Sequence, residues 1–366
     1  MGLDARTSAF LLLAACSSAP PGAGALPPDL RGAPVPEMGA TLKVIGTDKD
    51  GLAQPRGLQF APDHPDELWA VNQRTNGVVI FFDPGTPQQR AEARVDRYAQ
   101  HFMATVSGLA FGTQNRFATC QESRDPWNDS PQAPDDFMGP TLWLADLDVF
   151  ASVGQDYPLR AGAPEGSHID MLHESPLCMG IAHEADNVFW AFDGLNGHVV
   201  RYDFVQDHGP GGSNHKDGRV RRYVEATVTR LEETASQLAY DADSGLLYVA
   251  DTGAGRVTRL DTKSGHVAAT KTPPQMESLA EYAQVTDTTY DVFASGLVRP
   301  SGLALHDRRL FVSDAGTGEI VAFDLLGHEL GRVSTGARAI MGLTVGPEGK
   351  LYFVDRDNNS IVRVDP

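Results

Sequence analysis

One short pattern recurs along this chain: an apolar strand after a glycine, a turn, an aromatic-rich strand ending near an aspartate, a polar loop and a third strand. Residues 237–261, QLAYDADSGLLYVADTGAGRVTRLD, show it with Asp, Ser and Gly between runs rich in Val, Tyr and Leu. A lone three-stranded ribbon cannot bury its faces, so such a unit must be repeated. Further copies begin near residues 56, 107, 179, 301 and 341.

Units of this form resemble the NHL-repeat family of β-propellers, and the resemblance covers residues 54–366. It implies an all-β fold, a six-bladed β-propeller of four-stranded antiparallel blades. Both faces of a blade would then be covered, which explains apolar strands without clean alternation. Residues 40–46, ATLKVIG, read as a strand without a local partner, and the last unit ends after three strands. We therefore expect this N-terminal strand to pair with the C-terminal blade and close the ring.

The N-terminus predicts export. Residues 9–15 form a short apolar run, and the letters LAAC ending at Cys16 are similar to the cleavage box of bacterial lipoproteins. Cys16 would be the lipidation site, and Ser17 after it favours the outer membrane, facing the periplasm or the cell exterior. A plain secretory signal is the alternative.

Charge limits the partners. The formal net charge of −18 argues against nucleic acid and anionic membrane surfaces. No apolar run approaches membrane-spanning length, so we expect contact with a membrane only through the lipid anchor. We also expect a monomer. The expected organisation is a signal peptide (1–15), a disordered Pro/Ala/Gly-rich tether (16–39) and the propeller (40–366).

Propeller geometry also groups residues that are far apart in sequence. Loops that enter the innermost strands share a face with loops between second and third strands, so residues before the repeat glycines should line the mouth of the central channel. An insertion, 121–139, should overhang this mouth. The arginines there favour a small anionic ligand or an acidic segment of a protein partner. The expected ligand-binding residues are Arg56, Arg124, Trp127, His173, Met179, Met341 and Arg356.

Two cysteines fall near the same mouth. Cys120 ends the second strand of the second unit, and Cys178 precedes the first strand of the third. An oxidising compartment favours a disulfide between them. Two free buried thiols are one alternative, and a copper site using Cys178, Met179 and Met341 is another.

Histidines suggest a metal. His101 and His173 each lie seven residues before their repeat glycine, and His198 follows the polar loop of the third unit. Three imidazoles converging on one mouth could hold a divalent cofactor, zinc or calcium, with an open coordination position. Loop histidines bonded to the backbone are the alternative. His183 and His306 should lie toward the opposite face.

Two enzyme families with related propellers are similar in part. Peptidyl-hydroxyglycine lyases bind zinc through histidines close to the repeat starts, where this chain has Arg, Ser and Met. Gluconolactonase-like proteins show Pro-Asn-Gly at a repeat start, where this chain has Pro300-Ser301-Gly302. Both ligand sets are incomplete, so we expect a binding propeller of the cell envelope, with a metal-dependent lyase or hydrolase as the alternative. Two more insertions, 206–218 and 271–298, are candidate binding loops, and whether the first binds calcium is left open.

Overall fold

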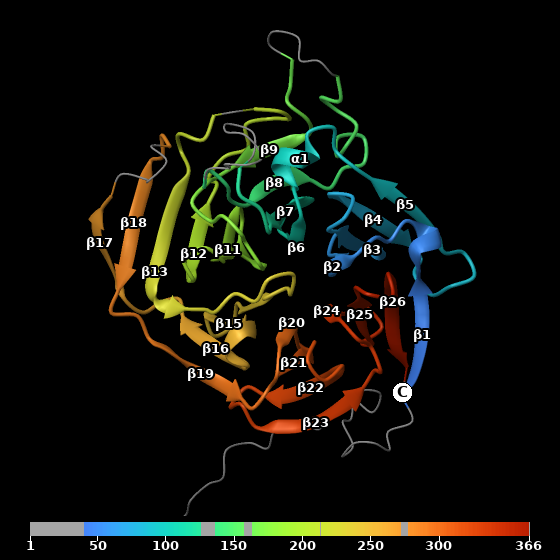
Figure 1. Ribbon diagram of the computed structural model, residues 1–366. Coiled ribbons are helices and arrows are strands. Elements are labelled where there is room, and N and C mark those ends of the chain that lie inside the picture. The colour runs from blue at the N-terminus through green and yellow to red at the C-terminus, as the bar shows by residue number, and fades with distance from the viewer. Residues whose placement is uncertain (1–39, 126–135, 157–162, 213, 272–276, 366) are drawn as a thin grey trace, which may run out of the picture.

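The structure is a computed structural model that describes residues 40–365 apart from 126–135, 157–162, 213 and 272–276. Its strands form six sheets around one axis (Figure 1). The hydrophobic core lies between neighbouring sheets. This confirms the predicted six-bladed β-propeller. The signal peptide, the tether and Cys16 lie outside the described residues. Within the described part, no helix is long and apolar enough to cross a membrane.

Three blades are simple four-stranded antiparallel sheets, numbered from the innermost strand outward. Blade 1 consists of β2 (Pro55–Ala61), β3 (His64–Asn72), β4 (Gly77–Phe82) and β5 (Arg90–Arg94). Blade 2 consists of β6 (Val106–Phe111), β7 (Arg116–Gln121), β8 (Thr141–Leu144) and β9 (His168–Met171), and α1 (Ala99–Phe102) precedes it. Blade 5 consists of β20 (Pro300–His306), β21 (Arg309–Asp314), β22 (Glu319–Asp324) and β23 (Glu329–Ser334).

The third and fourth blades are interlocked. Blade 4 consists of β14 (Leu238–Asp241), β15 (Leu246–Asp251), β16 (Arg256–Asp261) and β19 (Tyr290–Ser295). Blade 3 consists of β10 (Ile181–Ala185), β11 (Val188–Asp193), β12 (His198–Asp203) and β13 (Arg219–Thr227), extended by β18 (Glu281–Thr286) and β17 (His266–Thr270). The β17–β18 hairpin leaves blade 4 after β16, pairs in parallel with β13, and the chain then returns as β19 (Figure 1). One sheet is therefore six-stranded, because part of the expected 271–298 loop forms strands.

The last blade contains both ends of the described chain. It consists of β24 (Ile340–Val345), β25 (Leu351–Asp355), β26 (Ser360–Asp365) and β1 (Thr41–Gly46). β1 lies antiparallel on β26, with Thr41 opposite Asp365, so the predicted closure is confirmed. A Cβ at Gly46 would collide with the ring of Phe81, which shows how closely β1 packs on blade 1.

The core explains why the strands lack clean alternation. Every residue of β4 and of β11 is buried, because each strand lies between two neighbouring blades. Between blades 1 and 2, Trp69 packs edge-on against Phe117, whose ring stacks with that of Trp143. Large aromatic side chains therefore fill the wedge-shaped space between blades and leave the axis to the innermost strands.

Candidate functional site

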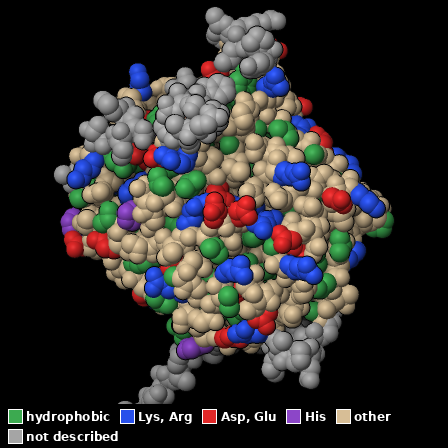
Figure 2. Space-filling view, in the orientation of Figure 1, with side chains coloured by type: hydrophobic (Ala, Val, Ile, Leu, Met, Phe, Trp, Pro, Cys, Tyr) green, Lys and Arg blue, Asp and Glu red, His purple; other side chains and the backbone are tan. Residues whose placement is uncertain are grey.

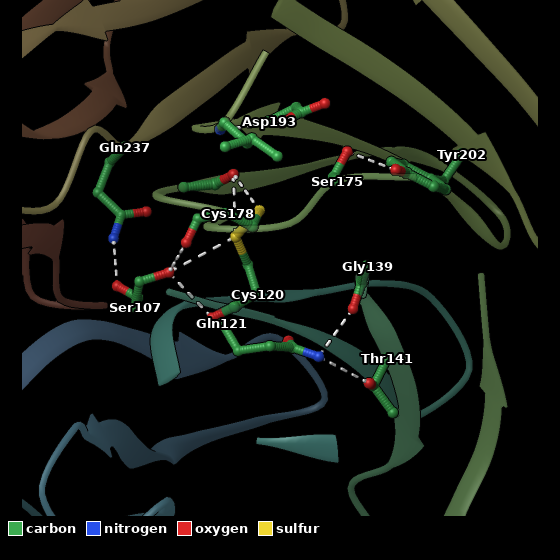
Figure 3. The surroundings of a disulfide bond; sticks show 12 residues. Ser107, Cys120, Gln121, Gly139, Thr141, Ser175, Cys178, Asp193, Tyr202 and Gln237 are labelled. Atoms are coloured by element: carbon green, nitrogen blue, oxygen red, sulfur yellow. Dashed lines mark hydrogen bonds between the residues drawn. A yellow bond between two sulfur atoms is a disulfide. The ribbon is translucent and has the colours of Figure 1, made fainter. Parts of the chain in front are cut away.

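A disulfide joins blade 2 to the loop before blade 3. Cys120 on β7 is bonded to Cys178, with 5.5 Å between their Cα atoms (Figure 3). The Ser107 hydroxyl donates to the carbonyls of Cys120 at 2.9 Å and Cys178 at 2.7 Å. The predicted disulfide is confirmed. The free-thiol alternative and the copper alternative are wrong, because the Cys178 sulfur is already bonded to Cys120.

The bond constrains a long loop. Its cysteines are 58 residues apart, so the chain-entropy model gives a stabilisation of roughly 4 kcal/mol before any strain. Such bonds are typical of proteins folded in an oxidising compartment.

Five charged residues from different parts of the ring meet in one network, and we name Arg56, Glu122, Arg230, Glu233 and Arg356 the arginine cap. Of these, Arg56 and Glu122 are buried. Arg56 donates through Nη1 to Oε2 of Glu122 at 2.5 Å. The other carboxylate oxygen of Glu122 accepts from Nη2 of Arg230 and, at 3.1 Å, from the backbone N–H of Glu233. Arg356 donates to the Glu233 carbonyl at 2.8 Å. The loop from β13 to β14, yellow in Figure 1, reaches toward the centre of the ring and turns back. Figure 2 shows acidic and basic side chains intermixed near that centre.

The cap leaves two donors without acceptors. Arg56 is 0% exposed, and burial lowers the pKa of its guanidinium, although the Glu122 charge and hydrogen bond raise it. Arg356 lowers that pKa further. Arg56 Nε donates to Gln73 at 2.8 Å, yet Arg56 Nη2 and Arg230 Nε are buried without a partner among the described residues. One carboxylate therefore serves two guanidinium groups.

The other residues expected at the mouth are spread out. Arg124 forms a partly exposed ion pair with Asp136 at 2.5 Å. Met179 and Met341 are buried in two different hydrophobic clusters. Trp127 lies outside the described residues. The structure thus brings Arg56 and Arg356 into one charged network and places the two methionines in the core.

Two of the three predicted metal ligands, His101 and His173, lie beside separate carboxylates, whereas Nδ1 of His198 is buried without a hydrogen-bond partner among the described residues. Nδ1 of His101 lies 3.3 Å from Oδ1 of Asp125. Nδ1 of His173 lies 2.6 Å from Oε1 of Glu277, and burial lowers the pKa of His173. The pKa of His198 is lowered by burial and then by Arg222. No His, Cys, Asp or Glu group of three or more in the described ranges is arranged to hold a metal, so the zinc or calcium prediction has no ready ligand set.

The acidic residues of the 206–218 loop both contact side chains of the protein. Arg116 forms an ion pair with Asp207, and Nε2 of His208 lies 2.8 Å from Oδ1 of Asp217. Nδ1 of His215 lies 2.7 Å from Oδ1 of the buried Asp170 on β9. Both carboxylates considered for calcium thus have protein partners that fasten the loop to blade 2 and to itself.

Sequence reasoning missed three of the five members of the cap, Glu122, Arg230 and Glu233. Glu122 follows the second strand of blade 2 by one residue, and Arg230 lies in the loop that enters blade 4. Both occupy loops that lead to the same face as Arg56. That position, rather than residue type, is the signal that could have identified them.

Comparisons with known proteins agree on the fold. No family model matches the sequence, and no curated protein matches it. Among solved structures, an auxiliary nutrient binding protein from Bacteroides thetaiotaomicron has a TM-score of 0.57 at 9% identity, covering 89% of this chain and 76% of that one. A luciferin-regenerating enzyme has a TM-score of 0.52 at 13% identity, and the match covers 90% of this chain and 96% of that one. A structural genomics protein of unknown function from B. thetaiotaomicron has a TM-score of 0.53 at 9% identity, and the match covers 89% of this chain and 76% of that one. Identities this low establish a shared propeller fold alone.

Proposed function

We propose that this chain is a non-catalytic propeller of the cell envelope that binds a small anionic ligand at the arginine cap. The observation that carries the proposal is the pair of buried donors, Arg56 Nη2 and Arg230 Nε, that lack an acceptor in the described part of the chain. An unpaired buried donor on a charged group costs free energy, and an anionic oxygen would recover it.

The solvent exposure of the arginines also favours ligand binding at the arginine cap. The side chains of Arg230 and Arg356 are 20% and 19% exposed, whereas Arg56 beneath them is fully buried. A ligand arriving from solvent would meet two partly exposed guanidinium groups before the buried one. An acidic segment of a partner protein presents the same carboxylates and is distinguished by the experiment below.

The envelope location rests on the disulfide and on the N-terminal pattern. A buried disulfide is typical of an exported protein. The proposed lipid anchor at Cys16 would hold the propeller at a membrane surface, at the end of the tether 16–39.

Calorimetric titration at low ionic strength tests the cap. The probes are citrate, inorganic phosphate and a glutamate-rich peptide, each added to wild type, to Arg230→Gln and to Arg259→Gln. The last is the matched control, because Arg259 on β16 pairs with Asp291 away from the cap. Losing one charge-assisted hydrogen bond should weaken citrate or phosphate binding by roughly tenfold in Arg230→Gln only.

Two results contradict this proposal. If none of the probes binds wild type saturably, the cap is a structural ion-pair cluster. If only the peptide binds, the ligand is a partner segment rather than a small molecule.

A further inference from the structure

A cavity of about 400 Å³ lies on the propeller axis, on the side away from the arginine cap. Its wall comes from the innermost strand of every blade: β2, β6, β10, β14, β20 and β24. Gly57, Gln237 and Gly342 lie at one end of the cavity and are buried. Phe60 and Tyr240 lie at the other end and are partly exposed. The cavity therefore opens where the innermost strands end.

Gln237 separates the cavity from the cap. Gln237 directly precedes β14 of blade 4. Its Nε2 donates a hydrogen bond of 3.1 Å to the Ser107 carbonyl in blade 2, on another side of the axis (Figure 3). A Cβ at Gly57 in blade 1 would lie 3.4 Å from the same nitrogen. The side chain thus spans the axis, and no member of the arginine cap lines the cavity.

The wall is polar but uncharged. Among the described residues that line it there is no Asp, Glu, Lys or Arg. Each innermost strand is the edge of its sheet, so one row of N–H and C=O groups points away from the sheet, toward the axis. Near the rim, neither the Tyr240 hydroxyl nor the His306 ring has a hydrogen-bond partner in the described part of the chain.

These features select a class of ligand. A charged molecule would lose its hydration without gaining a counter-charge, so an uncharged one is favoured. Hydroxyl groups both donate and accept, and therefore match a wall of mixed backbone N–H and C=O groups. Phe60 and Tyr240, which line the cavity and are partly exposed, supply apolar surface against which C–H faces can pack. The volume falls within the range of about 300–1,000 Å³ usual for small-molecule sites.

We propose that this axial cavity is a second binding site, for a small neutral polyhydroxylated molecule of the monosaccharide class. Tyr240 and His306 contact its hydroxyl groups at the open end, and Gln237 closes the far end. The inference does not depend on the anionic ligand of the cap, because the two sites share no residue.

Titration calorimetry with D-glucose, D-galactose and D-mannose tests the inference. At least one sugar should bind saturably with one site per chain. The double variant Tyr240→Phe/His306→Ala should weaken that binding by roughly tenfold through the loss of two hydrogen bonds. The control is Tyr290→Phe/His266→Ala, the same chemical changes on the outer strands β19 and β17. It should change the affinity by less than about twofold, and urea unfolding should show that both variants are folded.

An anionic sugar separates the two sites. D-glucuronate should bind the axial cavity more weakly than the neutral sugars, because no cationic side chain lines it. Absence of saturable binding by all the neutral sugars would overturn the proposal, as would undiminished binding in the Tyr240/His306 variant. Sugar binding that is lost in Arg230→Gln instead would assign the site to the cap.

Discussion

At the scale of single residues, His168 shows how burial sets a charge state. Its ring stacks on Phe102 at 3.7 Å, and its Nε2 lies 3.0 Å from the Gly212 carbonyl. Burial lowers the pKa of His168 from 6.5 to about 3, although the Gly212 hydrogen bond opposes this, and nearby His215 lowers it further. The folded chain therefore keeps this imidazole neutral over a pH range in which an unfolded chain protonates it.

The free energy of unfolding should therefore decrease as the pH falls. The stabilisation from neutral His168 is complete above pH 6.5 and is lost as the pH falls toward 3, because only the unfolded chain takes up the proton. Between pH 6 and 4 the loss should reach up to roughly 1.4 kcal/mol per pH unit. We expect His168→Phe, which can keep the stack on Phe102, to reduce the slope of unfolding free energy against pH by about that amount.

Urea unfolding at several pH values measures that slope. His266→Phe is the control, because it makes the same substitution at a mostly exposed histidine. An unchanged slope in His168→Phe would show that His168 is protonated in the folded state.

Residue partnerships were unevenly predictable. Cys120 and Cys178 could be paired from sequence, because both occupy defined positions in the repeat unit of adjacent blades. Glu122 was not predicted as the partner of Arg56 and Arg230, which are 66 and 108 residues away. Side chains that meet from one strand and two loops far apart in the chain leave no periodic trace in a sequence.

At the scale of elements, the β17–β18 hairpin joins two blades. It covers the outer edge of β13, and the side chains of Tyr282, Ala283 and Val285 on β18 are buried. After β17 and just before β18, Glu277 pairs with the buried His173. The hairpin therefore fastens blade 4 onto blade 3 by strand pairing and side-chain burial, and the contact between Glu277 and His173 ties its connection to the loop before blade 3.

We expect this hairpin to be a stability element. Replacing residues 263–288 with a short glycine-serine linker should lower the unfolding free energy by roughly 3 kcal/mol or more, mainly through the lost burial of Tyr282 and Val285. The freed edge of β13 should also promote association between chains. Urea unfolding and size-exclusion chromatography measure the two effects.

A point substitution gives the control for the hairpin. Val267→Thr on the exposed outer strand β17 keeps the pairing and should change stability by less than about 0.5 kcal/mol. If the linker variant were as stable as wild type and monomeric, the hairpin would be an accessory loop. Sequence could not assign it, because β18 pairs with a strand of another blade and no local pattern records a parallel partner.

At the scale of the whole molecule, ring closure by β1 couples the two ends of the described chain. Ile45 on β1 is buried in the cluster that also contains Phe81 and Val354 from blades 1 and 6. Removing β1 would expose β26 as an edge and open the contact between the first and last blades.

Two truncations test this closure. A chain beginning at Ala40 should unfold with the same free energy as the full chain. A chain beginning at Thr47 should lose roughly 3 kcal/mol or more through the burial of Ile45 and the strand pairing. Circular dichroism during urea unfolding compares them, and equal stability of the two truncated chains would mean that β1 does not hold the ring together.

The sequence by itself determined the number of blades, their order, the strand that closes the ring and the position of the disulfide. These follow from local patterns that repeat along the chain, such as apolar strands separated by Asp, Ser and Gly turns. Only the tertiary structure decided that Arg56 lies beneath a shared carboxylate, that Gln237 divides the axis and that the cavity opens beside Tyr240. Those outcomes depend on how side chains from separate blades share the narrow space at the axis, and residue spacing along the chain does not encode distances across it.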